Sequence, residues 1–283
     1  MKIVMTCTTW RLRINSAGQN FARFLSEQTM KPDIVYCWLA EEEFPNKEKD
    51  LPSEFLDFVK TFNVNLRWTE KNEYCHKRWY VYPDHYEDFV VSIDDDIVYP
   101  KTLIEEGYNM WRNNGCRPVI LQYMNMFREF GYNNDIRRIY LPIISFDSMK
   151  LQFYGQTIFP PKTFPLEAWT PEMHKIRMKI CPKCDESWFQ PFLIANKTFL
   201  LRNGNAISVH EDEIDELQKV GIRNSLYVPV VIDGQQYAIA DIYKLIVLKQ
   251  FPSLMHKWKL VFPTYNTSAL DKYTIDQLLE MLK

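Results

Sequence analysis

Short apolar runs alternate with amphipathic stretches over the first hundred residues of the chain. The runs are rich in β-branched and aromatic residues, which predicts strands, and they cover residues 2–9, 33–40, 63–70 and 87–93. Helices are predicted between them. The first begins with a capping-box pattern at Ser16 and Gln19 and ends before Pro32, and the second covers residues 53–62. This alternation predicts an α/β fold, with a mostly parallel sheet covered by helices on both faces.

Beyond residue 100 the pattern is less regular. Residues 125–180 show weak periodicity, and long segments of that kind usually carry function or cover a site. The other predicted elements are a helix at 101–113, a strand at 118–124, a helix at 184–196 broken by Pro191, strands at 198–202 and 205–209, and helices at 211–220, 238–250 and 271–283. We therefore expect a sheet-containing part, residues 1–210, and a helical extension, residues 211–283, packed on the same domain.

Composition limits the class of protein. With 283 residues, 46% of them hydrophobic, the chain can build a core for one large domain or two small ones. The net charge of −2 does not suggest a nucleic-acid-binding protein. No run reaches the ~18 apolar residues of a membrane span, and no signal-peptide pattern stands at the N-terminus. We expect a cytoplasmic protein, and peripheral contact with the inner face of the cell membrane stays open.

Six cysteines are present, and without a secretion signal we expect free thiols. Cys181 and Cys184 have the spacing of zinc ligands, but no second pair of cysteines or histidines follows at the distance typical of a zinc finger. The simpler interpretation is two thiols in a loop before a helix.

Three consecutive aspartates, Asp94, Asp95 and Asp96, follow the fourth predicted strand. Ligands of an open parallel sheet bind beyond the carboxyl ends of its strands. Strand alternation would direct Asp94 and Asp96 to one side and Asp95 to the other. Two carboxylates on one side suit Mg²⁺ or Mn²⁺, which keeps open positions for phosphate oxygens. The alternative is a helix start, where aspartate is a favoured cap, but one aspartate would serve that purpose.

Several motifs, in order along residues 3–200, give the chain a resemblance to a known family. They are Thr8-Thr9-Trp10, Arg13-Ile14, QTMKPDIVYCWLAEEEFP at 28–45, Leu51-Pro52, Lys77, SIDDDIVYP at 92–100 and CPKCDESWF at 181–189. Together they resemble a bacterial glycosyltransferase with the GT-A fold, of the type that builds surface polysaccharide or lipopolysaccharide. The resemblance implies a Rossmann-like three-layer α/β/α architecture with C-terminal helices.

The resemblance also implies roles for individual residues. Asp94 and Asp96 match the Asp-any-Asp motif that holds the metal and, through it, the diphosphate of a nucleotide-sugar. Asp95 lies beside the ribose in this scheme. The residues expected to line the nucleotide pocket or face the donor are Thr8, Thr9, Arg13 and Lys77.

An acidic pair, Asp185-Glu186, stands where similar enzymes have two aspartates before a tryptophan and an aromatic residue. Glutamate replaces the second aspartate here, so either carboxylate could be the catalytic base. The alternative is an exposed pair in the first turn of a helix, where acidic residues interact well with the dipole. His210 follows a short predicted strand and is the candidate third metal ligand; a solvated helix cap, Glu211 to Glu213, is the alternative there.

Other side chains are weaker candidates. His76 could bind phosphate or face solvent. Trp169 and Trp188 could stack on a sugar ring or belong to the core. Tyr154 and Gly155 could shape the acceptor side of the site, because glycine allows close approach of the backbone.

The expected activity is metal-dependent transfer of a hexose from a nucleotide-diphosphate sugar, with uridine diphosphate as the nucleotide by family habit. The acceptor would be a hydroxyl of a glycan or a lipid-linked molecule. Direct deprotonation of that hydroxyl by a carboxylate predicts inversion at the anomeric carbon. A homodimer stays open. Two other classes remain: a haloacid-dehalogenase-like phosphatase with Asp94 as nucleophile and Asp96 as acid, and a non-catalytic module that binds sugars or nucleotides.

Overall fold

A seven-stranded sheet forms the centre of the protein. The computed structural model describes residues 1–117, 119–123, 156–196, 199–203, 229–261 and 269–283. The strand order is β3-β2-β1-β4-β6-β5-β7. All neighbours are parallel except β6, which is antiparallel to β4 and β5. The strands are β1 Ile3–Thr8, β2 Ile34–Ala40, β3 Asn65–Thr69, β4 Phe89–Ile93, β5 Val119–Tyr123, β6 Gln156–Phe159 and β7 Phe199–Asn203.

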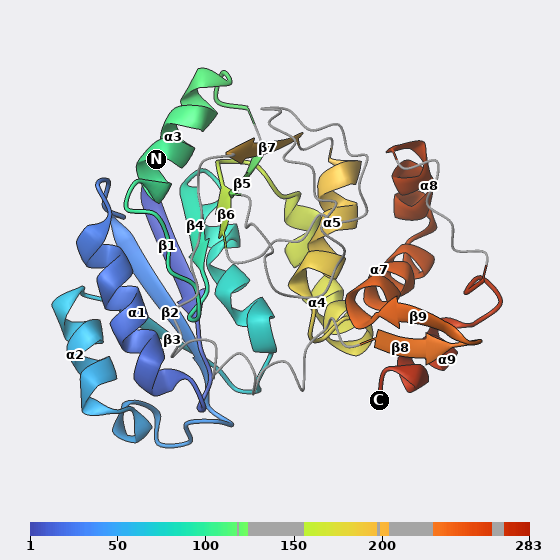
Figure 1. Cartoon of the computed structure of the whole chain (residues 1–283), viewed down its shortest axis with the longest axis horizontal. Helices are drawn as coiled ribbons and strands as arrows, with labels where there is room; N and C mark the ends of the chain where they lie inside the picture. The colour runs from blue at the N-terminus through green and yellow to red at the C-terminus, as the bar shows by residue number, and fades with distance from the viewer. Residues whose placement is uncertain (118, 124–155, 197–198, 204–228, 262–268) are drawn as a thin grey trace.

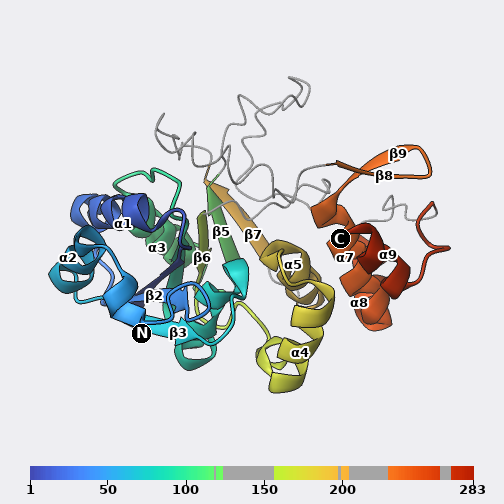
Figure 2. The ribbon, with the colours of Figure 1, turned by 90° about the horizontal axis from the view of Figure 1, so that it is seen from below.

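Helices cover both faces of the sheet (Figures 1 and 2). On one face lie α1 Ile14–Glu27, α2 Ser53–Thr61 and α3 Leu103–Asn113. On the other face lie the 3₁₀ helix η2 Tyr74–Val81, α4 Pro171–Ile180 and α5 Asp185–Ala195. Beyond α5 come the hairpin β8 Pro229–Ile232 and β9 Gln235–Ala238, then α7 Ile239–Gln250, α8 Pro252–Val261 and α9 Ile275–Met281. The predicted α/β class, with a mostly parallel sheet and C-terminal helices, is confirmed.

Each face of the sheet has its own apolar core. Met5, Val91 and Ile93 pack with the residues of α1, α2 and α3. Val4 and Val90 belong to a second cluster that also includes α5 and the C-terminal helices. Alternate residues of β1 and β4 therefore serve opposite cores, as the two-residue period of a strand requires. The boundary predicted between residues 210 and 211 lies outside the described residues.

Two local predictions were wrong. Helix α1 begins at Ile14, before the predicted capping box, and the hydroxyl of Ser16 donates to the carbonyl of Arg13 at 3.1 Å. Side-chain bonding to the preceding turn competes with the capping role of serine. Helix α5 continues through Pro191 without the predicted break. A single proline removes one hydrogen bond, and the apolar contacts of α5 on both of its sides compensate for it.

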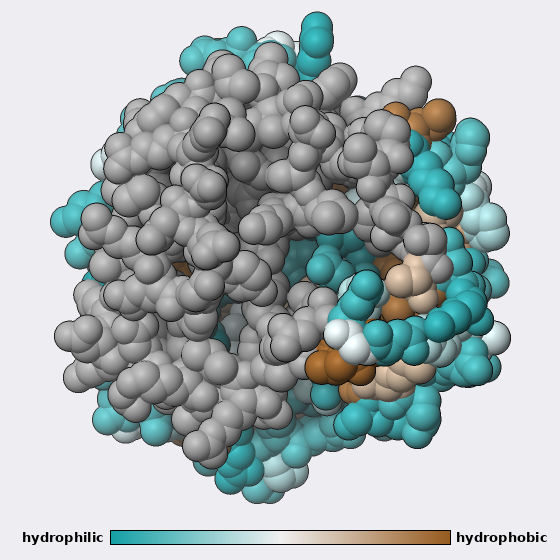
Figure 3. Space-filling view, turned by 45° about the vertical axis from the view of Figure 1, so that its right-hand side comes forward, coloured by the Kyte–Doolittle hydropathy of each residue, from teal (hydrophilic) through white to brown (hydrophobic). Residues whose placement is uncertain are grey.

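The C-terminal part contains elements that the sequence pattern did not predict, namely α8 and the β8–β9 hairpin. The predicted strand at 205–209 and helix at 211–220 lie outside the described residues. On the face shown in Figure 3, the described atoms of the C-terminal part are largely hydrophilic, with small apolar areas between them. In the described part of the chain, no helix combines the length and the hydropathy that crossing a membrane would require.

Candidate active site

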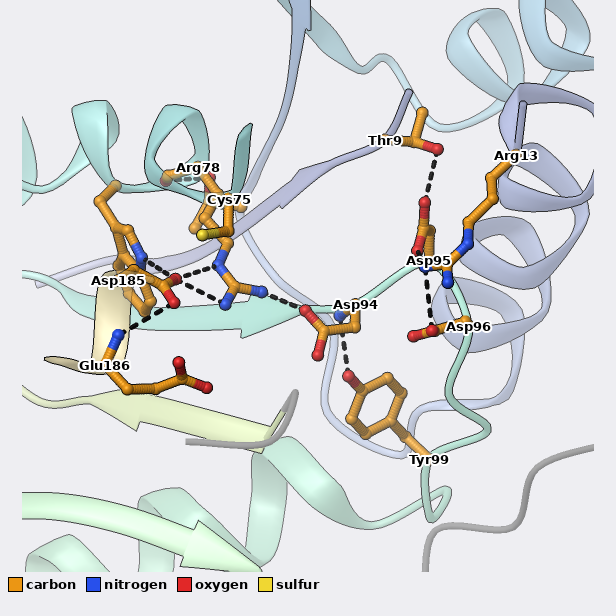
Figure 4. Close-up of polar contacts among 12 residues, drawn as sticks. Thr9, Arg13, Cys75, Arg78, Asp94, Asp95, Asp96, Tyr99, Asp185 and Glu186 are labelled. Carbon is orange, nitrogen blue, oxygen red and sulfur yellow. Dashed lines mark hydrogen bonds and ion pairs between the residues drawn. The ribbon is translucent and has the colours of Figure 1, made fainter. Parts of the chain in front are cut away.

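The carboxyl ends of β1 and β4 bring two predicted motifs together. The two strands are adjacent, with Cys7 opposite Ile93, so Thr9 and the three aspartates lie at the same edge of the sheet. The Thr9 hydroxyl donates to Oδ2 of Asp95 at 2.6 Å. Arg13, at the start of α1, places Nη1 2.9 Å from Oδ1 of Asp95 and 2.9 Å from Oδ2 of Asp96. Arg13 therefore compensates two of the three negative charges (Figure 4).

Asp94 lies apart from the other two aspartates. Strand β4 ends at Ile93, so strand alternation does not extend into the aspartates and does not decide how Asp94 and Asp96 face each other. Figure 4 shows Asp94 on the side of Arg78, and Asp95 and Asp96 on the side of Arg13. The backbone N–H of Asp94 donates to the hydroxyl of Tyr99 at 2.8 Å, which holds the turn in place.

Arg78 connects Asp94 to the acidic pair at the start of α5. Its Nη1 pairs with Oδ1 of Asp94. Its Nη2 lies 2.7 Å and its Nε 3.2 Å from Oδ2 of Asp185. The guanidinium is buried between the two carboxylates. Two motifs far apart in the sequence therefore meet through Arg78.

Sequence reasoning selected Lys77, the neighbour of Arg78, as the basic residue of the site. Lys77 is also buried, but its ammonium donates to Oδ1 of Asn72 at 2.7 Å. Successive residues of a 3₁₀ helix point about 120° apart, so neighbouring basic residues have different partners. In the sequence, Arg78 is recognisable as a site residue only as a basic residue close to the predicted carboxylates. The same is true of Lys77, so the sequence does not distinguish the two.

Asp185 accepts hydrogen bonds at both oxygens. Trp79 Nε1 donates to Oδ2 at 2.6 Å, in addition to Arg78, and the backbone N–H of Glu186 donates to Oδ1 at 3.0 Å. Burial alone would raise the pKa of Asp185, but the Arg78 charge and these hydrogen bonds lower it to about 2. A carboxylate so stabilised in its charged form is a poor proton acceptor.

Glu186 has the opposite properties. Its Oε2 accepts a hydrogen bond from the thiol of Cys184, with 3.3 Å between the sulfur and the oxygen. Burial and the neighbouring charge of Asp185 raise the pKa of Glu186 to about 7. The charge of Asp94 also contributes to this shift, and Figure 4 shows the Glu186 side chain below Asp185, on the opposite side of the Arg78 guanidinium from Asp94. A carboxyl group that titrates near neutral pH is well matched to general base catalysis.

The aspartates fit a hard divalent cation by their chemistry. Burial, together with the charges of Asp96, Asp95 and Asp185, raises the pKa of Asp94 to about 6 despite the pairing with Arg78. The arginines therefore leave negative charge uncompensated, and carboxylate oxygens are the preferred ligands of Mg²⁺ and Mn²⁺. Within the described residues, no three His, Cys, Asp or Glu side chains are arranged to hold a metal ion. His210 lies outside the described residues, so the metal roles of Asp94, Asp96 and His210 stay predictions.

The remaining candidates either contact other residues of the protein or lie outside the described residues. Trp188 is fully buried against Phe192, which places it in the core. Trp169 stacks on Tyr82. The hydroxyl of Thr8 donates to the carbonyl of Trp38 at 2.8 Å. Tyr154 and Gly155 lie outside the described residues.

His76 and the cysteine thiols are the last candidates. His76 Nε2 lies 2.8 Å from the carbonyl oxygen of Cys181. Burial lowers the pKa of His76 to about 3, so the ring is neutral and is no phosphate-binding cation. The prediction of free thiols is confirmed for all six cysteines, Cys7, Cys37, Cys75, Cys116, Cys181 and Cys184.

Comparison with known proteins gives similarity at the level of three-dimensional structure alone. No model of a known protein family matches the sequence, and no curated protein matches it significantly. The structure of S. aureus TarS is 12% identical, with a TM-score of 0.46, over 95% of this chain and 50% of that chain. This chain thus spans about half the length of TarS.

Two complexes are also similar to this chain. One is S. aureus TarS 1–349 with UDP-GlcNAc, at 13% identity and a TM-score of 0.46, over 99% of this chain and 79% of that chain. The other is the mannosyltransferase PcManGT from Pyrobaculum calidifontis with GDP-Man and Mn²⁺, at 11% identity and a TM-score of 0.41, over 99% of this chain and 78% of that chain. Similarity at this level does not establish a family for this chain.

Proposed function

We propose that the protein is a glycosyltransferase that moves a sugar from a nucleotide-diphosphate sugar, a UDP-sugar, to a hydroxyl of a glycan or lipid-linked acceptor. The observation that carries this proposal is the bridge of Arg78 between Asp94 and Asp185. It joins the strand-end aspartates, suited to a diphosphate and its metal, to a helix start that presents a carboxyl group of raised pKa, Glu186.

The residues divide the work of the reaction. Asp94 and Asp96 would hold Mg²⁺ or Mn²⁺, and the bound ion would supply charge neutralisation for the diphosphate as it leaves. Thr8, Thr9, Arg13, Lys77 and Asp95 belong to the nucleotide side of the site in this proposal.

Glu186 is the proposed base. It would take the proton from the acceptor hydroxyl, which then attacks the anomeric carbon on the face opposite the diphosphate. This single displacement inverts the anomeric configuration. Asp185 stays ionised and holds Arg78 in place, so it serves the site without exchanging a proton.

The setting of the reaction follows the sequence resemblance. We propose a role in surface polysaccharide or lipopolysaccharide synthesis in the cytoplasm, at the inner face of the membrane where lipid-linked acceptors are found.

A donor screen tests the activity without knowledge of the acceptor. Purified protein is incubated with a panel of nucleotide-sugars and Mn²⁺, and release of the nucleotide diphosphate is followed. We expect slow hydrolysis of one donor, loss of that hydrolysis with a chelator, and inversion when the product is examined by NMR. Retention of configuration would contradict direct attack by the acceptor.

Variants of the acidic pair test the division of roles. Glu186→Gln keeps the size of the side chain but cannot accept the proton, so transfer should fall by about 10²- to 10⁴-fold while calorimetry shows unchanged binding of UDP with Mn²⁺. Release of phosphate from simple phosphomonoesters, without turnover of any nucleotide-sugar, would instead favour the phosphatase class. Binding of glycans with no effect of nucleotide would favour the non-catalytic module.

A further inference from the structure

A chain of polar contacts runs from Glu186 to the C-terminal helices. The Cys184 sulfur lies 3.3 Å from Oε2 of Glu186 and 2.9 Å from the hydroxyl oxygen of Ser187. The Ser187 hydroxyl lies 2.7 Å from the carbonyl oxygen of Ala240 in α7. Cys184 directly precedes α5, and its carbonyl accepts the N–H of Trp188, so its side chain lies beside the first turn of that helix.

The number of protons available decides which group donates and which accepts at the Ala240 end of this series of hydrogen bonds. The carbonyl oxygen of Ala240 can only accept a hydrogen bond, so the hydroxyl of Ser187 donates its single proton to it. The oxygen of Ser187 can then only accept from Cys184. The thiol also has one proton, and it has two neighbours, Ser187 and Glu186, that can take it.

The charge of Glu186 decides between these neighbours. When Glu186 is ionised, its oxygen can only accept, and a charged acceptor binds a donor more strongly than a neutral hydroxyl does. When Glu186 is protonated, its O–H can donate to the sulfur, and the thiol proton can turn to Ser187. The chain from Glu186 through Cys184 and Ser187 to Ala240 is then continuous, with one proton in each contact.

We propose that Cys184 is a positioning residue for Glu186, whose thiol rotates to donate to the ionised carboxylate and to accept from the protonated one. This inference rests on the proposed role of Glu186 as the base. The contact holds the carboxyl group in one place before and after it takes the acceptor proton. No bond is broken in the switch, because only the S–H direction changes.

Other charged groups surround Glu186 and stay unchanged in the variants below. They are Asp185 on its own helix, Arg78 from η2 and Asp94 after β4. Cys75, also from η2, and Cys181 are near enough for the charge of Glu186 to add to the effect of burial, which raises the pKa of both thiols. From α7 the contact through Ser187 is a backbone carbonyl, which does not titrate.

Two substitutions should move the pKa of Glu186 in opposite directions. Cys184→Ala removes the donor to the carboxylate, so the acidic limb of the pH–rate profile should move up by about half a unit to one unit, with kcat about three- to tenfold lower. Ser187→Ala removes the competing acceptor, so the thiol donates to Glu186 alone and the limb should move down. Cys184→Ser retains a donor at this place and should restore most of the rate.

Cys181 supplies the matched control. It is equally buried, and its thiol donates to the carbonyl of Cys184 at 3.0 Å instead of contacting Glu186. Cys181→Ala should change stability without moving the acidic limb. If Cys184→Ala and Cys181→Ala lower the rate equally and leave the limb in place, the thiols only fill space and the proposal is overturned.

A direct titration of Glu186 separates this proposal from the proposed function. The carboxyl signal is followed by infrared spectroscopy or carbon NMR and is assigned by its loss in Glu186→Gln, so no turnover is needed. Opposite shifts in Cys184→Ala and Ser187→Ala, without any sugar transfer by the wild-type protein, would support the switch and reject the transferase. Sugar transfer by the wild-type protein, with no shift of the Glu186 pKa in either variant, would support the transferase and reject the switch.

Discussion

At the scale of single residues, two arginines from different elements compensate the three aspartates that end β4. Arg13 reaches Asp95 and Asp96 from the start of α1, and Arg78 reaches Asp94 from η2. Because Arg78 also holds Asp185, its removal would leave the buried carboxylate of Asp185 and the partly buried carboxylate of Asp94 without their cation. Breaking a buried ion pair on one side usually costs more than the pair itself contributes.

We predict a pH-dependent loss of stability for Arg78→Met. In the wild-type protein the pKa of Asp185 is lowered from 3.8 to about 2, so its ion pair stabilises the fold above pH 3.8 and is lost as the pH falls toward 2. Without Arg78, burial raises the pKa of Asp185 above the unfolded value, so stability is lost as the pH rises. Urea unfolding at pH 7 should show a loss of about 3–5 kcal/mol, with a smaller loss at pH 5.

Lys77→Met is the control for that experiment. The two basic residues are neighbours and both are buried, but burial lowers the pKa of Lys77, so its charge is costly in the folded chain. Its replacement removes one hydrogen bond to Asn72, which should lower the free energy of unfolding by about 1 kcal/mol. Equal losses for both variants would mean that the Arg78 bridge has no special energetic role.

The same residues show what the sequence could and could not predict about the site. Asp94, Asp96, Asp185 and Glu186 could be named as candidates because the order of residue types in the sequence shows carboxylates after an apolar strand and at a helix start. Arg78 was missed because its role depends on the direction of a side chain in a short 3₁₀ helix. Which of the acidic pair has the raised pKa likewise depends on contacts with Arg78 and Trp79, and these are fixed only by tertiary packing.

At the scale of elements, α1 and α2 cross where α1 has no side chain. A Cβ added to Gly18 would lie 3.1 Å from Cδ2 and 3.2 Å from Cα of Phe55. The close contact with a backbone atom means that α2 itself would have to move.

Sequence patterns located both helices well, because their apolar periodicity is strong. The start of α1 was misplaced because Ser16 bonds backward to Arg13 instead of capping.

We predict that Gly18→Ala destabilises the protein by about 1 kcal/mol and leaves donor binding intact. Overpacking of this kind costs about 1–3 kcal/mol, and the better helix propensity of alanine returns up to about 1 kcal/mol. Gln19→Ala, an exposed position of the same helix, should change the free energy of unfolding by less than about 0.5 kcal/mol. If Gly18→Ala instead raised the free energy of unfolding, α2 would be able to shift away from the added methyl group without loss of stability, and the prediction would be wrong.

At the scale of the whole molecule, the site is assembled from segments that are distant in the chain. The carboxyl ends of β1 and β4, the start of α1, the helix η2 and the start of α5 each supply one or two of its side chains. Helix α5 in turn packs against α7 and α8 in one apolar core. A ligand that contacts both the aspartates and Glu186 would therefore connect the sheet to α5 and, through α5, to the C-terminal helices.

This coupling predicts a cooperative stabilisation by nucleotide and metal. A ligand that binds only the folded chain stabilises it by about 2.7 kcal/mol at 100 times its Kd, which for a protein of this size is a rise of several degrees in Tm. We expect that rise with UDP and Mn²⁺ together, and little with UDP and a chelator, because the uncompensated charge near Asp94 repels the diphosphate when no cation is present. Asp96→Asn should reduce the difference between the two conditions. The same rise with and without Mn²⁺ would show that the arginines alone receive the diphosphate, and the aspartates would then have no metal to hold.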